Sequence, residues 1–497
     1  MPSRLPGFSR IYRLFRLRTV TGRIRAFTAV VLLVLTALFV IAGMAMWDAR
    51  DALRTIGHEE GPTVVATSDL YLALSDMDAQ AANVLLTGRE DDWLCDPEQT
   101  AQGGPSCERN YPRFYYDIRR EDAQRAALQA ARLAEDDPVR LRTVQSVLDG
   151  LHQYDQRVQA TMERGRLTEH TFGILPEDAA REYRAATMLM TENLLPKAYN
   201  LTLDSAAVVD ATYQDERSGV LSGRVGAVVV GLAAIAAMTG LHVCLTRPFQ
   251  RLLSPFLAVA ALGTVAVTVA SASLLATEAD YLRVTKEDGF DQVLLLSRTQ
   301  AISKSLNADR TRFLLARSDF DADRYDQTYL EKSQTILYIP TANNLDTYDI
   351  ELGEWLKQYG NGTHQVDFDG LYGKEAGTVA VSGQRQSLDI LLSRYLRSQR
   401  NDHEVRQMAR AGKHNEAARV HMDTGRNPDL SYLPYPGFRA HDEGLAARIS
   451  RQQYVVDRTV KNAERALELW PWLLPASLVG IAALVVAGIW PRLSEFR

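Results

Sequence analysis

Residues 26–47, AFTAVVLLVLTALFVIAGMAMW, decide the fold of this chain, because they form an uncharged apolar run long enough to cross a bilayer as a helix. The hydrocarbon core of a membrane requires about 20 such residues. Three further runs of similar length and composition follow, at residues 225–245, 252–276 and 470–490. The sequence therefore predicts an all-α membrane protein with four transmembrane helices.

The arginines predict which side of the membrane each segment faces. Residues 1–25 carry no acidic residue, and cationic side chains beside a membrane crossing stay in the cytoplasm. They carry seven arginines: Arg4, Arg10, Arg13, Arg16, Arg18, Arg23 and Arg25. We expect both termini to be cytoplasmic in a multi-pass plasma membrane protein. Cleavage of residues 26–47 as a secretory signal is disfavoured, because an h-region has only about 7–15 apolar residues.

The crossings divide the chain of 497 residues into alternating segments. Two long polar segments, 48–224 and 277–469, are expected outside the cell, each of ordinary domain size. The expected cytoplasmic parts are the basic tail 1–25, the turn 246–251 and the residues 491–497. Arg247 and Arg251 in that turn are candidates for coupling to a cytoplasmic partner.

Charge and cysteine content indicate which classes of partner the protein can bind. The net charge is −5 although the first 25 residues hold +7, so the remainder is acidic, which argues against a nucleic-acid ligand. The basic tail favours the lipids of an anionic inner leaflet. Cys95 and Cys107 lie close together in an expected outer loop, where a disulfide is favoured over a metal site because no histidine lies nearby.

Both polar segments predict helical bundles. In the first, Leu70, Leu74, Met77 and Ala81 repeat at the spacing of one helix face. Asp137-Pro138 predicts a helix boundary, since proline suits the first turn of a helix. Facing seams of this kind are buried most simply in an antiparallel four-helix bundle. In the second segment, residues 336–381 have turn-forming residues and are expected to contain a short hairpin rather than helix.

The two segments also resemble each other locally. Aligning Leu85-Leu86 with Leu314-Leu315 places residues 75–80 on residues 304–309 without a gap. This similarity predicts a tandem repeat, although two helices that obey one heptad rule would show it too.

Charged residues beside these two seams are the candidate contacts for a ligand or partner protein. They are Asp76, Asp78, Asp309, Arg310 and Arg312. The alternative is that they lie on solvated helix faces, as most charged side chains do.

Motifs for catalysis were sought and not found. The sequence has no phosphate-binding loop, no Gly-x-Ser-x-Gly elbow and no His-Glu-x-x-His pattern, so we expect no enzyme activity, no cofactor and no metal. The expected cytoplasmic segments are too short to fold a catalytic domain. The crossings carry almost no charge, which disfavours a transporter.

The arginine-rich tail (Arg4 to Arg25), the four crossings and the matched stretches Ser75 to Gly88 and Lys304 to Arg317 carry a family resemblance. A helix that leaves the membrane, forms an outer bundle and returns is similar to the sensing half of chemoreceptors. Two such units in tandem resemble the GlnX-type membrane proteins of actinobacteria. The resemblance implies passage of an amino-acid signal from a solute-binding lipoprotein outside to protein kinase G inside.

The sequence thus favours a non-enzymatic transmembrane sensor that relays an extracellular signal to a cytoplasmic kinase, with a homodimer as one possible assembly. The alternative is a structural or scaffolding membrane protein of the cell envelope, whose helices would not change position when a ligand binds.

Overall fold

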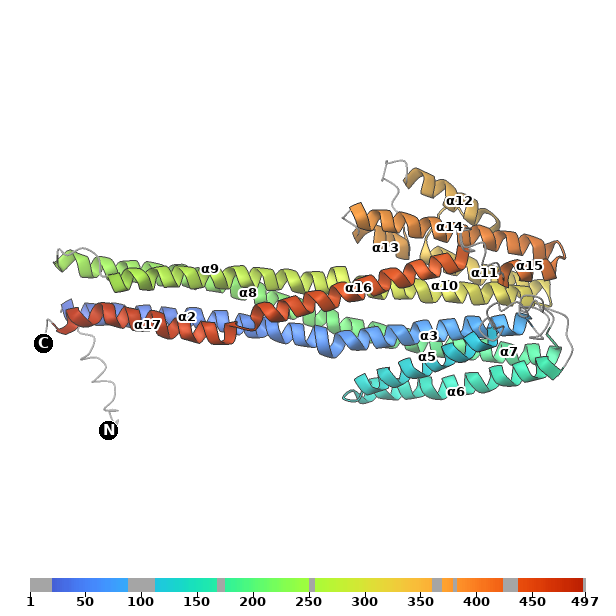
Figure 1. The fold of residues 1–497 in the computed structure, drawn as a ribbon, viewed down its shortest axis with the longest axis horizontal. Coiled ribbons are helices and arrows are strands. Elements are labelled where there is room, and N and C mark those ends of the chain that lie inside the picture. Colours follow the sequence, from blue (N-terminus) through green and yellow to red (C-terminus); the bar gives the residue numbers. More distant parts are fainter. Residues whose placement is uncertain are drawn as a thin grey trace, which may run out of the picture. The chain divides into compact units, whose positions relative to one another are not determined.

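The computed structural model describes residues 20–87, 112–167, 175–249, 255–359, 369–378, 382–422 and 437–494. These residues are almost wholly helical (Figure 1). The only β-type pairing within those ranges is an isolated bridge between Tyr338 and Asp369. The predicted all-α class is confirmed. Cys95, Cys107 and Arg251 lie outside the described residues. Arg247 lies within the described helix that ends at Phe249, but its side chain is not described.

The chain divides into two compact units. Unit 1 comprises residues 1–58, 209–286 and 456–497, and unit 2 comprises residues 59–208 and 287–455. Each of the four connections between the units passes through helical residues.

Unit 1 contains the apolar helices. They are α2 (Val20–Arg54), the later part of α8 (Leu195–Phe249), α9 (Pro255–Arg283) and α17 (Trp470–Ser494). Within the part of the chain that the structure describes, four helices are long and apolar enough to span a membrane, as predicted. Helix α17 packs against α9 and α2. Many large apolar side chains are exposed, among them Leu33, Val229 and Leu262, as expected for helices that lipid would surround.

The first polar segment supplies four helical stretches to unit 2. They are α3 (Glu60–Thr87), α5 (Pro112–Leu133), α6 (Pro138–Leu167), and α7 (Glu177–Leu189) with the π-helical turn η4 (Met190–Leu194) and the start of α8. The predicted seam of α3 is buried, with Leu70, Leu74, Met77 and Ala81 all fully covered. Helix α6 begins at Pro138 as predicted, and the Asp137 carboxylate accepts a hydrogen bond from the Val139 amide at 2.8 Å.

The second polar segment supplies the remaining helices of unit 2. They are α10 (Asp291–Leu315), α11 (Asp319–Ile336), α12 (Leu345–Gln358), α13 (Leu371–Thr378), α14 (Ser382–Arg410), α15 (His414–Met422) and the earlier part of α16 (Gly437–Leu467). Helices α3 and α10 lie side by side (Figure 1) and pack closely. Their shared core includes Leu86 from the first segment and Leu314 from the second, so the two segments form one compact unit.

The expectation for residues 336–381 is wrong in part, because two helices occur there. Asn344 caps α12 by accepting a hydrogen bond from the Thr347 amide at 3.0 Å, and Leu345, Tyr348 and Leu352 bury one face of that helix. Helix α13 follows at Leu371. The residues of the expected hairpin, Val366, Phe368, Val379 and Val381, lie outside the described ranges.

Two π-helical turns occur at matching places. Turn η1 (Thr55–Glu59) separates α2 from α3, and turn η5 (Val284–Phe290) separates α9 from α10. Each lies where a helix with an apolar crossing continues into unit 2. The starts of the two turns are 229 residues apart, which is also the offset that aligns Leu85-Leu86 with Leu314-Leu315.

Candidate functional site

Helix α10 is the central helix of unit 2, since every residue from Thr299 to Leu315 is buried. This burial includes four charged side chains, on Lys304, Asp309, Arg310 and Arg312. A charge removed from water is tolerated only when it is paired and hydrogen-bonded. The partners of these four side chains therefore determine how the helices around α10 are positioned.

Arg312 pairs with Asp78 on α3, and both side chains are 1% exposed. The second oxygen of Asp78 accepts a hydrogen bond from the Tyr154 hydroxyl at 3.0 Å. Arg312 also donates to Asp309 at 2.8 Å, and Asp309 pairs with Lys332 of α11. Burial by itself would lower the pKa of Arg312, but Asp78, Tyr183 and Asp309 together outweigh it and hold that pKa well above its ordinary value.

A second group of ion pairs surrounds Asp76. Its carboxylate lies 3.0 Å from the Arg119 guanidinium of α5 and 3.2 Å from the Lys304 ammonium of α10. Lys304 in turn lies 2.8 Å from Asp442 of α16. Burial acts to lower the pKa of Lys304, but Asp76 and Asp442 together raise it, so the ammonium stays charged.

Two contacts between α3 and α10 join residues with the same sequence separation. Asp76 pairs with Lys304, and Thr311 donates a hydrogen bond to Asn83 at 2.8 Å; both pairs are 228 residues apart. A constant separation means that the two helices run parallel. We call Asp76, Asp78, Lys304, Asp309 and Arg312 the ionic interface of unit 2.

Arg310 belongs to a separate cluster within the second segment. Its guanidinium lies 2.7 Å from Asp402 of α14 and donates to the Tyr329 hydroxyl at 3.2 Å. Asp402 also accepts from Arg406 at 2.8 Å. Burial would raise the pKa of Asp402, but these two arginines outweigh it and lower that pKa. This cluster holds α14 against α10.

The five candidate residues from the sequence are therefore all buried, and the alternative that they lie on solvated faces is wrong. The structure joins Asp78, Asp309 and Arg312 through direct ion pairs, places Asp76 in the second group with Lys304, and places Arg310 in the separate cluster with Asp402. Arg312 lines a cavity of about 40 Å³, enough for a water molecule. Contact with a ligand or partner remains a prediction.

Sequence reasoning missed several members of these clusters. Lys304, Asp402 and Asp442 carry no motif, and nothing in the polar sequence of α10 marks a fully buried helix. The alignment of residues 75–80 with residues 304–309 could have found Lys304, because like helices of a repeat tend to pack on each other, whereas Asp402 and Asp442 lie outside it.

The comparison with protein families bears on the segment that contains Asp76, Asp78 and Tyr154. Residues 52–214 match the actinobacterial sensor domain. The matched sensor segment runs from the end of α2 through α3, α5, α6 and α7 into α8. Its similarity supports an actinobacterial sensor protein. Neither the curated proteins nor the solved structures contain a match to the chain.

Part of the ionic interface thus comes from the sensor segment and part from the segment that follows it. Asp76 and Asp78 lie within the matched residues, whereas Lys304, Asp309 and Arg312 lie on α10. Any change in the sensor segment that moves α3 must change these buried pairs.

Proposed function

We propose that the chain is a non-enzymatic transmembrane sensor in which the ionic interface couples the sensor segment to the second polar segment. The observation that carries the proposal is the match of residues 52–214 to a sensor domain, together with the ion pairs that join α3 of this segment to the buried residues Thr299 to Leu315 of α10. In this proposal a ligand or a ligand-loaded protein binds unit 2 and shifts α3 along α10.

The buried ion pairs favour discrete positions of α3. Removing one partner of a buried pair costs about 3–5 kcal/mol, so intermediate positions that break Asp78–Arg312 are disfavoured. Switching proteins commonly use helix shifts of about 1–2 Å between two packed arrangements. A small displacement of α3 would exchange one set of buried pairs for another.

The helical connections provide the route out of unit 2. The chain passes between the units at residues 58–59, 208–209, 286–287 and 455–456, each within η1, α8, η5 or α16. A helix transmits displacement along its axis, because its backbone hydrogen bonds make it stiff. The apolar helices of unit 1 would then carry the signal across the membrane.

We place unit 2 outside the cell and both termini in the cytoplasm. Support comes from the seven arginines before residue 26 and the absence of acidic residues among them. The basic tail, with Arg247 and Arg251, would then be available to a cytoplasmic kinase, and unit 2 to a solute-binding lipoprotein. Relay of an amino-acid signal, as the resemblance to GlnX-type proteins implies, is part of this proposal, and so is a homodimer.

We also propose that the polar segments are tandem copies of one unit. The matched positions of η1 and η5 support this, because π-helical turns are rare and usually mark functional positions. Parallel packing of α3 on α10 in nearly the same register would then resemble the contact between two subunits of a dimer.

Cysteine cross-linking within unit 1 tests the sensor proposal. An added Cβ at Gly219 of α8 would lie 3.9 Å from the Asp48 Cβ of α2, a separation that a disulfide can bridge, so Asp48→Cys with Gly219→Cys reports on that helix pair. Membranes carrying the full chain, with Cys244→Ser, are oxidised with and without each of the twenty amino acids, and with a periplasmic or cell-wall extract. The proposal expects at least one addition to change the cross-linking rate.

The variant Asp78→Asn is the matched control. It should still cross-link without additions but lose the response, because the coupling from α3 to α10 is weakened. An unchanged rate with every addition would favour a scaffold and contradict the sensor proposal.

A further inference from the structure

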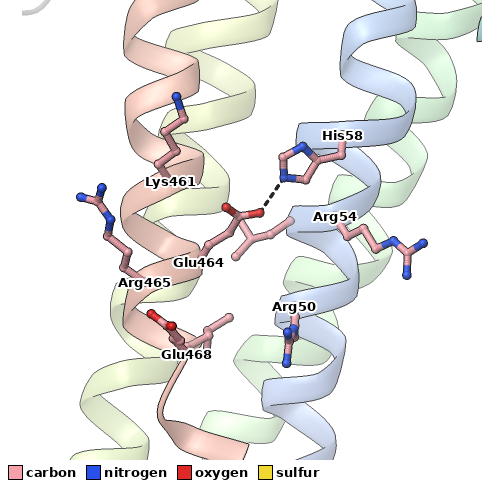
Figure 2. Close-up of a pocket in the computed structure, with 9 residues that line it drawn as sticks. Arg50, Arg54, His58, Lys461, Glu464, Arg465 and Glu468 are labelled. Atoms are coloured by element: carbon pink, nitrogen blue, oxygen red, sulfur yellow. Dashed lines mark hydrogen bonds and ion pairs between the residues drawn. The ribbon is translucent and has the colours of Figure 1, made fainter.

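A charged cavity lies in unit 1 where α2 and α16 face each other. Its volume is about 590 Å³, within the range of about 300–1,000 Å³ that is typical of ligand pockets. Figure 2 shows its charged lining, with Arg50 and His58 on the side of α2 and η1 and with Lys461, Glu464 and Arg465 on α16.

The cavity has an excess of positive charge. Its lining contains four cationic side chains and two carboxylates, together with His58. Glu464 is engaged by the His58 ring at 2.6 Å. Among the described residues, no carboxylate lies within ion-pairing distance of Arg50, Lys461 or Arg465. These three exposed cations on facing helices complement an anion.

An apolar crevice adjoins the charged cavity. Its volume is about 340 Å³, and it lies between α2 and α17. The side chains that line it are mostly aliphatic or aromatic, including Phe39, Met46 and Leu474. Arg50 and Leu467 line both spaces, so the charged cavity and the crevice lie next to each other.

The local sequence explains why this crevice is open. Helix α16 ends at Leu467 and α17 begins at Trp470, with Pro471 and Pro475 in its first two turns, where proline cannot donate a backbone hydrogen bond. On the opposite wall, an added Cβ at Gly43 would meet no atom within 4 Å. The crevice therefore has room beside α2.

We propose that this amphipathic site binds an anionic phospholipid, with the phosphate near Arg50, which lines both spaces, in the positive field of Lys461 and Arg465, and with an acyl chain in the crevice. The lipid would come from the leaflet that contains Trp47 and Trp470, since tryptophans are enriched where a crossing meets the lipid headgroups. A soluble anion would satisfy the cations but leave the apolar crevice unfilled. Basic groups near a membrane surface each favour anionic lipid, which supports this occupant.

Lipid titration of the full chain, followed by native mass spectrometry, tests the site. The probes are phosphatidylglycerol, phosphatidylcholine and soluble glycerol phosphate. We expect phosphatidylglycerol to bind at least about tenfold more tightly than either of the others. The combined variant Arg50→Gln, Lys461→Gln, Arg465→Gln should remove that preference, and added salt should weaken it.

Matched variants distinguish lipid binding at this site from the general effects of losing a charge or adding a side chain. Arg458→Gln removes a charge from α16 that does not line the cavity, and it should bind phosphatidylglycerol as the wild type does. Gly43→Leu should fill the crevice and weaken lipid binding, whereas Gly240→Leu should not, although an added Cβ is equally unhindered there.

Three results would overturn the proposal. One is equal binding of phosphatidylglycerol and phosphatidylcholine, and another is glycerol phosphate binding as tightly as phosphatidylglycerol. The third is retention of the preference in the triple variant, which would place the lipid elsewhere. None of these outcomes depends on whether unit 2 senses a ligand.

Discussion

Substitution of Asp78 by asparagine should destabilise unit 2 more than almost any other single charge removal. Asp78 and Arg312 are both 1% exposed, and Asp78 also accepts from Tyr154. In Asp78→Asn the neutral amide no longer balances the charge of the buried Arg312 guanidinium. Arg312 would still pair with Asp309, but that carboxylate also pairs with Lys332. Removing one partner of such a pair costs about 3–5 kcal/mol, a large part of the roughly 5–15 kcal/mol that stabilises a domain.

Hydrogen exchange measures this loss where it occurs. Peptides from α3 and α10 in the full-length protein report the free energy of local opening. Because about 1.4 kcal/mol corresponds to a tenfold change, a loss of about 3–5 kcal/mol in Asp78→Asn should accelerate their exchange by roughly 10²- to 10⁴-fold. The double variant Asp78→Asn, Arg312→Met should exchange more slowly than Asp78→Asn, since no buried charge is then left without its partner.

An exposed pair provides the control. Glu354 and Lys357 lie 3.5 Å apart with side chains 60% and 71% exposed, and such pairs contribute little to stability. Glu354→Gln should leave exchange in α3 and α10 unchanged. If Asp78→Asn behaved like Glu354→Gln, the pairing of Asp78 with Arg312 would not stabilise unit 2 and the reasoning would fail.

Three further predictions concern unit 2. Lys304→Met should lower the free energy of unfolding, measured by chemical denaturation, by about 3 kcal/mol, because Asp76 and Asp442 lose a buried partner. The double variant Lys304→Met, Asp76→Asn should regain part of that free energy. Burial lowers the pKa of His441 to about 3, so only the unfolded chain protonates this ring as the pH falls below about 6.5. The free energy of unfolding should therefore decrease by about 1.4 kcal/mol per pH unit towards pH 3. Chemical denaturation at several pH values should show that His441→Gln removes this contribution. Gly437→Ala should lower the melting temperature by an amount equivalent to about 1–3 kcal/mol, because the added Cβ would lie 2.4 Å from the backbone nitrogen of Ser398, which cannot move aside as a side chain can.

Controls distinguish these effects from general damage. Lys357→Met removes an exposed lysine and should change stability little. Gly444→Ala meets the side chains of Arg394 and Leu391 at 3.0 Å and should cost less than Gly437→Ala. A pH slope that is the same with and without His441 would show that this ring does not stay neutral in the folded protein.

Hydropathy predicted the membrane helices, because a bilayer crossing imposes a length and an apolar composition that few other structures share. The seam from Leu70 to Ala81 and the start of α6 at Pro138 were predictable for a similar reason: each follows a local rule of helix packing or capping. These features depend on neighbouring residues alone.

The ionic interface could not be predicted from local rules. Helix α10 is buried on all sides from Thr299 to Leu315, yet its charged and polar residues resemble those of an exposed helix. Its burial depends on α3, α11, α14 and α16 converging from distant parts of the chain, with a partner for each charge. Helix α12 was missed because Tyr338, Pro340 and Asn344 before it indicated turns, and Asn344 proved to be its N-cap.

Cross-linking between α3 and α10 tests the central claim most directly. Asn83 and Thr311 are in hydrogen-bond contact at 2.8 Å, so Asn83→Cys with Thr311→Cys should form a disulfide in membranes, whereas Asn83→Cys with Lys304→Cys, about two helical turns away, should not. The account predicts that an addition which alters the Asp48–Gly219 cross-link also alters the rate of the Asn83–Thr311 cross-link. A response between the membrane helices with an unchanged rate between α3 and α10 would contradict it.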